Sequence, residues 1–475
     1  FRMVKRSRDK RKDESMEVKR SFVLTSFHIN SKILEKDSCS AIRQMLSKGD
    51  PFPHVHLDNF VGDGNRAIHH LEKELLTMDW RRRENDLYTL SQTVDLKSLK
   101  ATQAPFLYSF RRFLTTSVRS WLSETTGIEL TSQVDSTGSV YTNHDGLLPH
   151  SDLIGTRHFA FVYYLTDKEW EEEHGGYLQL YSANDNHEPI EVVKSLKPKR
   201  NSLFYLRVSA DSWHRVAEVL TDRYRLSVNG WFHSTRKLDP PPINIRTIQR
   251  FSPTSKDVDL SDLVVDQYQK PDMVAQVKMF FNDESEVMIN DFVEESLNAS
   301  VFQSLNKTMF SAVGPPAKGN LMRAESSSLK GGCCLSLLYL ISSFALYLTH
   351  LTSIDLDETQ LSSKYIDWNV VGYSISGDEE LKESTKMDIV STVISSSEER
   401  EDESAGGVIV YAGKGDTQEL IRLQPSGRSL ALVLREPDVY SFLKYANSSA
   451  SSPIYSFSLP IIMYPWKMWR NRMIL

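Results

Sequence analysis

Two residue types that bind metal ions lie two positions apart in this sequence, at His150 and Asp152. On a strand, residues i and i+2 point to the same face, so an imidazole and a carboxylate at this spacing can bind one ion. A third ligand has to come from another strand, and His214 lies in a β-like run at Trp213–Val219. Two histidines and one carboxylate form the facial triad of non-haem iron(II) sites, which leaves positions open for a co-substrate and O₂.

The His-x-Asp spacing alone is weak evidence, because His56 and Asp58 show it as well. That second pair has no histidine at a suitable distance in a following strand. Zinc accepts the same ligands as iron and would suit a hydrolase, so the three residues by themselves leave the metal open.

An arginine after the third ligand favours iron used with 2-oxoglutarate. Arg225 begins the β-like run 225–232, and a tight turn around 221–223 predicts that this run returns antiparallel beside His214. A guanidinium there can form a bidentate pair with a carboxylate, and Ser227 on the same face can add a hydrogen bond. An acid whose other end chelates iron fits this arrangement, and 2-oxoglutarate is such an acid.

The sequence around these residues is typical of a jelly roll with helices beside it. Short β-like runs separated by turn signals fill residues 132–233. Two helical patterns precede them, at Ala67–Met78 and Phe106–Leu122. A break at Ser234–Pro242 is followed by a second β-rich region, from about Tyr365 to Met463. We therefore predict a mainly β fold with flanking helices and two jelly-roll domains.

Four stretches of the sequence carry a family resemblance: Leu147–Asp152, Gly175–Ser182, Trp213–Val219 and Arg225–His233. Together they resemble the ribosomal prolyl-hydroxylase family of 2-oxoglutarate- and Fe(II)-dependent oxygenases, the human oxygenase domain-containing protein 1 type and its yeast relatives. The resemblance covers about residues 51–464. The sequence departs from the family pattern at Pro149, often a cysteine there, and at Ser151, often acidic; neither position is a ligand.

The resemblance implies roles for single residues. By it, Fe(II) is bound by His150, Asp152 and His214. Arg225 then binds the distal carboxylate of 2-oxoglutarate. Tyr141 and Tyr164 match family positions that line the co-substrate pocket, although ordinary strand packing also accounts for buried tyrosines.

The resemblance also implies a fold and a function. The fold is two double-stranded β-helix domains, of which only the N-terminal one is catalytic; after His233 the sequence has only one histidine, His350. The substrate is a prolyl residue of a small-subunit ribosomal protein, so that the reaction affects translation. O₂ is consumed, ascorbate serves as reductant, and the expected location is the nucleus and cytoplasm.

The expected organisation along the chain has five parts. They are a basic disordered tail (1–20), the catalytic oxygenase domain (21–235), a linker (236–270), a second, non-catalytic β-helix domain (271–464) with an acidic disordered loop (395–403), and an atypical C-terminal tail (465–475). Within the second domain, the uncharged run Gly331–Ile354 is long enough to span a bilayer. Its Ser, Thr and His residues and the acidic residues after it favour a buried helix instead.

Composition limits the partners. The 475 residues carry 56 Lys and Arg against 62 Asp and Glu, a net charge of −6, which disfavours a nucleic-acid binder beyond the basic tail. Three cysteines cannot form a disulfide framework. Two alternatives stay open: a catalytically silent scaffold or sensor with the same fold, and a nucleic-acid demethylase with the same iron chemistry. The oligomeric state is not indicated.

Overall fold

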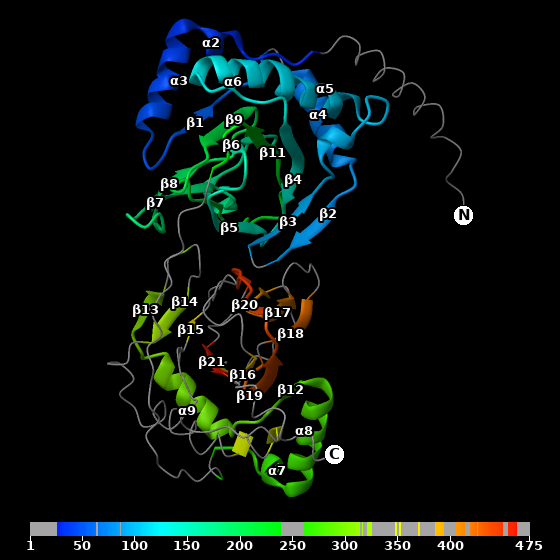
Figure 1. The fold of residues 1–475 in the computed structure, drawn as a ribbon, viewed down its shortest axis with the longest axis vertical. Helices are drawn as coiled ribbons and strands as arrows, with labels where there is room; N and C mark the ends of the chain where they lie inside the picture. Colours follow the sequence, from blue (N-terminus) through cyan, green and yellow to red (C-terminus); the bar gives the residue numbers. More distant parts are fainter. Residues whose placement is uncertain are drawn as a thin grey trace, which may run out of the picture. The chain divides into compact units, whose positions relative to one another are not determined.

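A computed structural model describes the chain in two units, Phe1–Pro242 and Ile243–Leu475 (Figure 1). The residues that it describes are 26–62, 65–85, 87–238, 261, 263–313, 316, 321–324, 347–348, 351–352, 369–370, 385–393, 405–413, 419–424, 426–449 and 455–462.

The first unit is built on a sheet of eleven strands. In the order in which neighbours hydrogen-bond, these are β1-β9-β6-β11-β4-β3-β5-β10-β7-β8, with β2 paired to β3 beside this path. Their bounds are β1 His54–Leu57, β2 Arg81–Glu84, β3 Tyr88–Gln92, β4 Val134–Tyr141, β5 Gly146–His150, β6 Arg157–Tyr164, β7 Leu178–Ala183, β8 Pro189–Leu196, β9 Ser202–Arg207, β10 His214–Val216 and β11 Arg225–His233.

Helices lie together on one side of this sheet (Figure 1). They are α2 Ser31–Leu34, α3 Lys36–Lys48, α4 Asn65–Leu76, α5 Pro105–Phe113, a π-helical turn at Leu114–Val118 and α6 Arg119–Thr126; short 3₁₀ turns occur at Leu96–Ser98 and Glu172–His174. Pro105 occupies the first turn of α5, where its missing N–H costs nothing. Gly127 ends α6 in the left-handed conformation at φ 72°.

The central strands have two buried faces, which explains why they are apolar nearly throughout. On β6 the alternate residues Phe159, Phe161 and Tyr163 pack in the core under the helices. The residues between them, Ala160, Val162 and Tyr164, belong to a second cluster on the other face. We call these the outer and the inner face; side chains alternate between them along each strand.

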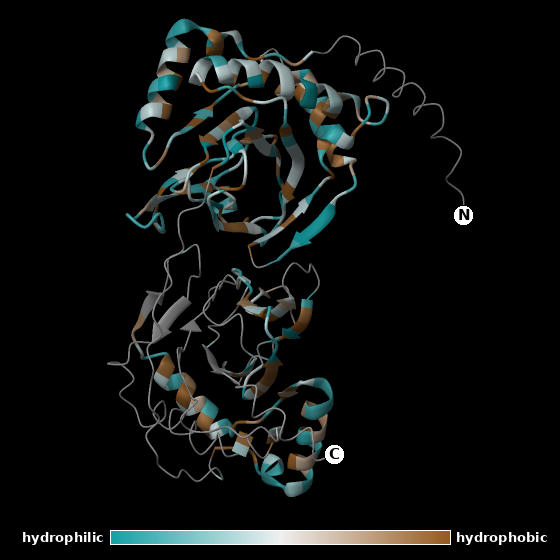
Figure 2. Cartoon of the chain, viewed as in Figure 1, coloured by the Kyte–Doolittle hydropathy of each residue, from teal (hydrophilic) through white to brown (hydrophobic). Residues whose placement is uncertain are grey.

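The sheet curls until its two edge strands meet. The Lys194 ammonium on β8 donates to the backbone oxygen of Asp50 at 3.4 Å and lies 3.2 Å from His54 Nε2 on β1. The inner face therefore lines the inside of a curled, half-barrel sheet. Strand β2 lies on the outside edge of this sheet and is hydrophilic along its length (Figure 2), with all four residues exposed.

The described residues of the second unit form two smaller sheets. A seven-stranded sheet has the order β12-β19-β16-β21-β15-β14-β13, and a three-stranded sheet the order β18-β17-β20. The strands are β12 Glu286–Ile289, β13 Phe310–Val313, β14 Leu321–Ala324, β15 Asn369–Val370, β16 Lys386–Val393, β17 Ile409–Gly413, β18 Glu419–Leu423, β19 Ser429–Arg435, β20 Val439–Leu443 and β21 Tyr455–Ile462. The helices are α7 Asp266–Gln269, α8 Pro271–Glu284 and α9 Glu295–Leu305.

The prediction of a mainly β fold is confirmed by the curled sheet of the first unit. The predicted return of Arg225 beside His214 is wrong. Strand β10 pairs with β5 and β7, and β11 pairs with β4 and β6. A short turn between two β-like runs suggests a hairpin, but here the connection carries the chain from one part of the curled sheet to another.

Several predicted features lie outside the described residues. They are the basic tail 1–20, the acidic loop 395–403, the C-terminal segment 465–475 and most of Gly331–Ile354. Of the last segment, residues 347–348 and 351–352 are described, and Leu348 and Leu351 are buried in the core of the second unit. Among the described residues, no helix has the length and apolar character needed to cross a membrane.

The helix layer is held to the sheet by aromatic packing, which gives a first prediction. Phe110 on α5 is fully buried, with its ring centroid 4.8 Å from that of Tyr163 on β6. We expect Phe110→Ala to lower the free energy of unfolding by about 3–5 kcal/mol, because it removes a large side chain and leaves a cavity. The control is Tyr108→Ala on the same helix, where the side chain is 37% exposed and the cost should stay within about 0.5 kcal/mol. Urea denaturation of the full chain measures both; equal losses would contradict the packing argument.

Candidate active site

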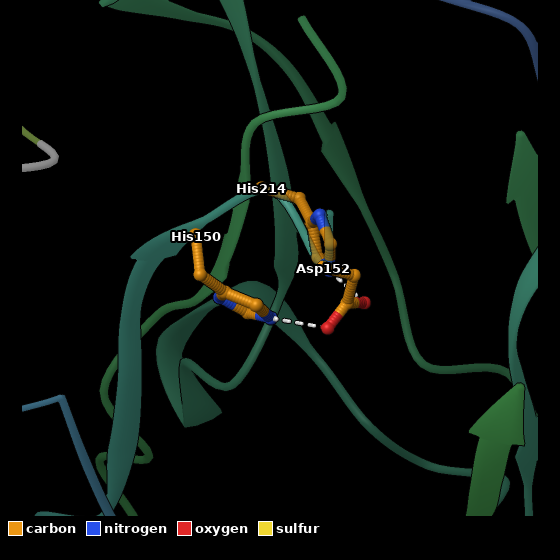
Figure 3. Close-up of side chains that lie close together, drawn as sticks. All are labelled: His150, Asp152 and His214. Atoms are coloured by element: carbon orange, nitrogen blue, oxygen red, sulfur yellow. Dashed lines mark ion pairs between the residues drawn. The ribbon is translucent and has the colours of Figure 1, made fainter. Parts of the chain in front are cut away.

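Strand pairing places the two predicted histidine ligands opposite each other. His150 ends β5 and His214 begins β10, and the two are directly paired in the antiparallel register. Directly paired residues of antiparallel strands point to the same face. Their ring centroids are accordingly 4.2 Å apart (Figure 3).

Backbone contacts orient both imidazoles. His150 Nδ1 lies 2.9 Å from the carbonyl oxygen of Leu148, and His214 Nδ1 lies 2.8 Å from that of Ser212. Donation from each Nδ1–H leaves each Nε2 with a free lone pair, the state that a metal ligand needs. Burial, and then the neighbouring His214, lower the pKa of His150 to about 4, so this ring is neutral at pH 7.

The Asp152 carboxylate faces both Nε2 atoms (Figure 3). Its Oδ1 lies 3.8 Å from His150 Nε2, and its Oδ2 lies 3.5 Å from His214 Nε2. Burial acts to raise the pKa of this carboxyl, but the neighbouring His214 and then His150 outweigh it and hold the pKa well below its usual range. The prediction that Asp152 continues the strand of His150 is wrong: β5 ends at His150, and Asp152 has φ 60°.

The three side chains fit a metal ion. Each offers one ligand atom, and these atoms all lie within 4.8 Å of one another. They are two imidazole nitrogens and one carboxylate oxygen, the donor set of the iron(II) facial triad. Within the described part of the chain no other group of three such residues comes together. The other His-x-Asp pair, His56 and Asp58, does not belong to such a group. Asp58 forms an ion pair with Lys199, and His56 contacts Ser202.

A buried cation lies on the same inner face. Arg225 is 2% exposed, and its Nε donates to the backbone oxygen of Gly176 at 2.7 Å. No carboxylate among the described residues lies within ion-pair distance of its guanidinium. A buried charge without a counter-ion is costly, so this one is suited to bind an anionic ligand.

Two tyrosines flank this guanidinium. Tyr141 lies directly opposite Arg225 on β4, and the guanidinium is 5.0 Å from its ring centroid. Tyr164 on β6 lies at 5.1 Å, and its hydroxyl is 3.4 Å from Arg225 Nη2. Burial raises the pKa of Tyr141 to about 12 and also raises that of Tyr164, so both stay neutral hydroxyls. Ser227 is buried and lies two residues along β11 from Arg225, on the same face.

A pair of glycines lets the backbone approach Arg225. Gly175 and Gly176 have φ of 63° and 66°, backbone angles that residues other than glycine rarely adopt. A Cβ on Gly175 would lie 2.1 Å from the oxygen of Glu218, and one on Gly176 would lie 3.1 Å from Arg225 Cδ. In the sequence these glycines indicate only a turn before a strand, so their contact with the arginine was missed.

Two further residues near the metal ligands were also missed. Arg157 begins β6, and its Nη1 lies 3.8 Å from Asp152 Oδ1. Its guanidinium stacks 3.5 Å from the ring centroid of Trp231 on β11. Neither residue has a spacing to the His-x-Asp pair that would single it out; only the pairing of β6 with β11 brings them together.

Two family models match the chain. One, described as the 2OG-Fe(II) oxygenase superfamily, matches residues 136–233, which include all the site residues above. The other, described as the oxoglutarate and iron-dependent oxygenase degradation C-terminal domain, matches residues 255–463.

Known proteins are similar over a large part of the chain. Prolyl 3-hydroxylase OGFOD1 of Xenopus laevis is 30% identical over 438 residues, covering 84% of this chain and 83% of that protein. Prolyl 3-hydroxylase OGFOD1 of Mus musculus is 34% identical over 50% of this chain and 44% of its own. Prolyl 3-hydroxylase sudestada1 of Drosophila melanogaster is 36% identical over 39% of this chain and 35% of its own. The chain therefore belongs to the OGFOD1 family of 2-oxoglutarate- and iron(II)-dependent oxygenases.

Proposed function

We propose that this protein hydroxylates a prolyl residue of a protein substrate, with Fe(II) bound by His150, Asp152 and His214. One observation carries the proposal: the two histidines of a metal-ligand triad lie on the inner face of the same sheet as a buried arginine, which has no carboxylate partner among the described residues. A zinc hydrolase needs the triad but gives no reason for the buried cation. An oxygenase that uses a dicarboxylic co-substrate needs both.

Each residue of the site has its own role in the proposed reaction. His150 and His214 present oriented Nε2 lone pairs, and Asp152 supplies negative charge. Arg225 pairs with the distal carboxylate of 2-oxoglutarate, while Tyr164 and Tyr141 exclude water around it. When bound, the iron, 2-oxoglutarate and O₂ supply the oxidation of an unactivated C–H bond, and the protein supplies position and shielding from solvent.

The substrate is, in this proposal, a small-subunit ribosomal protein, and the reaction affects translation. The names of the relatives support a prolyl target. The ribosomal target rests on the sequence resemblance alone, as do ascorbate as reductant and a location in the nucleus and cytoplasm.

The second unit is proposed to be a non-catalytic β-helix domain. After His233 the chain contains one histidine, His350, so residues 243–475 cannot assemble a second triad with two histidines. Two sheets, of seven and three described strands, share one hydrophobic cluster, in which Val390 and Val433 of the larger sheet pack with Tyr411 of the smaller, and this supports the β-helix assignment.

Hydroxylation itself is the direct test. The full chain is incubated with Fe(II), 2-oxoglutarate, ascorbate and proline-containing peptides of small-subunit ribosomal proteins, and mass spectrometry follows the products. The proposal expects a gain of one oxygen on proline together with succinate. Succinate without any peptide oxidation would point to another substrate class, and absence of both would contradict the oxygenase.

Removing a ligand should abolish metal binding without unfolding the protein. We expect His214→Ala to weaken Mn(II) binding by more than ~100-fold, beyond the usual cost of changing an outer-shell partner. The control is Asp58→Ala, in the His-x-Asp pair that forms no metal cluster. Electron paramagnetic resonance measures free Mn(II), and circular dichroism checks the fold. Equal binding by wild type and His214→Ala would show that the metal lies elsewhere.

Removing the arginine should affect the co-substrate and not the metal. We expect Arg225→Ala to raise the dissociation constant of 2-oxoglutarate by about two to four decades, because a buried carboxylate loses a partner worth about 3–5 kcal/mol. Arg223→Ala, two residues earlier at an exposed ion pair with Asp167, should bind normally. Titration of the Mn(II)-loaded proteins measures both, and an unchanged curve for Arg225→Ala would assign this arginine another role.

A further inference from the structure

The Asp152 carboxylate is not held in place by its own strand. Strand β5 ends two residues earlier, and Asp152 lies in a loop in the left-handed region. Locally, its backbone oxygen accepts from Ile154 N at 2.7 Å, which fixes the main chain but not the side chain. The carboxylate therefore needs contacts from elsewhere in the fold, and the two histidines cannot supply them once they bind a metal.

Arg157 reaches this carboxylate from β6. Its Nη1 lies 3.8 Å from Asp152 Oδ1, and its side chain is 21% exposed. Stacking on the indole of Trp231 at 3.5 Å fixes the plane of the guanidinium. The arginine is thus aimed at Asp152 by an aromatic ring on the neighbouring strand.

Trp231 offers a second donor. Its Nε1 is buried and makes no hydrogen bond to a described residue. A buried donor without an acceptor costs free energy, so a nearby acceptor is expected. Arg157 stacks on this indole and also lies 3.8 Å from Asp152 Oδ1, so the Asp152 carboxylate is the acceptor that we assign to it.

Metal binding by Asp152 would leave one of its carboxylate oxygens for the two donors, Arg157 and the N–H of Trp231. A carboxylate of a facial triad bonds the metal through one oxygen, and its second oxygen then needs donors. We infer that Arg157 and Trp231 are positioning residues, which bind the second oxygen of Asp152 and hold the first toward the metal. The inference rests on the proposed function, because it presumes that the triad binds metal.

The experiment compares two variants with one matched control. Trp231→Phe keeps an aromatic ring under Arg157 but removes the N–H. Arg157→Met keeps a long side chain but removes the charge. The control is Trp121→Phe: this indole also has a buried N–H without a described acceptor, but it packs in the core under the helices. Three quantities are measured on the full chain: the Mn(II) affinity, the thermal unfolding temperature, and the KM for a peptide that the wild type hydroxylates.

We expect Trp231→Phe and Arg157→Met each to weaken Mn(II) binding about 10-fold, the lower end of the cost of losing an outer-shell partner, and Trp121→Phe to bind normally. If the Trp231→Phe variant does not fold, the Mn(II) affinity of Arg157→Met alone tests the inference. Unchanged Mn(II) affinity with a raised peptide KM would overturn the inference and assign the pair to the substrate. An equal loss in Trp121→Phe would overturn it as well.

The wild type separates this inference from the proposed function. A wild-type protein that binds Mn(II) and loses it in His214→Ala retains the proposed site, whatever Trp231→Phe does. A wild type that binds no Mn(II) overturns both.

Discussion

The charge of Arg225 is the constraint on which the first unit depends. The positive charge of a guanidinium that is 2% exposed needs a negatively charged partner, and no described carboxylate pairs with it. The fold offers one carbonyl, from Gly176, and the faces of two tyrosine rings. These contacts stabilise the cation only in part, because none carries a full negative charge. In the proposed function a co-substrate carboxylate completes the pairing, so the first unit carries the cost of an unpaired buried charge until this ligand binds.

The curl of the sheet turns this charge toward the metal site. Arg225 lies on β11, and the two histidines lie on the paired strands β5 and β10. Strand β11 is a neighbour of neither of these two strands in the sheet. A flat sheet would keep these strands apart. Curling brings their inner faces toward one interior, and the contact of Lys194 with His54 closes the edges. The helix layer buries the outer face of β6, β9 and β11, the last of which carries Arg225.

Local sequence patterns predicted the site residues better than the way in which they meet. The spacing of His150 and Asp152 indicated a shared face, and they do meet, but Asp152 reaches the site from a loop at φ 60°. Arg225 was expected beside His214 on a hairpin, yet it comes from a different part of the sheet. Both errors have one cause: pattern and spacing describe a strand by itself, whereas strand order is decided by long-range pairing. For the same reason Arg157, which stacks on Trp231 of the neighbouring strand β11, gave no signal in the sequence.

The second unit shows how the charge of a half-buried arginine is neutralised within the protein. Arg435 Nη2 donates to Asp388 Oδ1 at 3.2 Å, and its Nε lies 2.9 Å from Oδ2. Asp388 is 3% exposed, on the strand next to that of Arg435. An arginine already paired with a carboxylate has little to gain from a second one, whereas Arg225 has no such partner among the described residues. Both units thus shield a guanidinium from water, but only the guanidinium of the second unit has a carboxylate partner among the described residues. In the proposed function, the first unit receives this partner with the co-substrate.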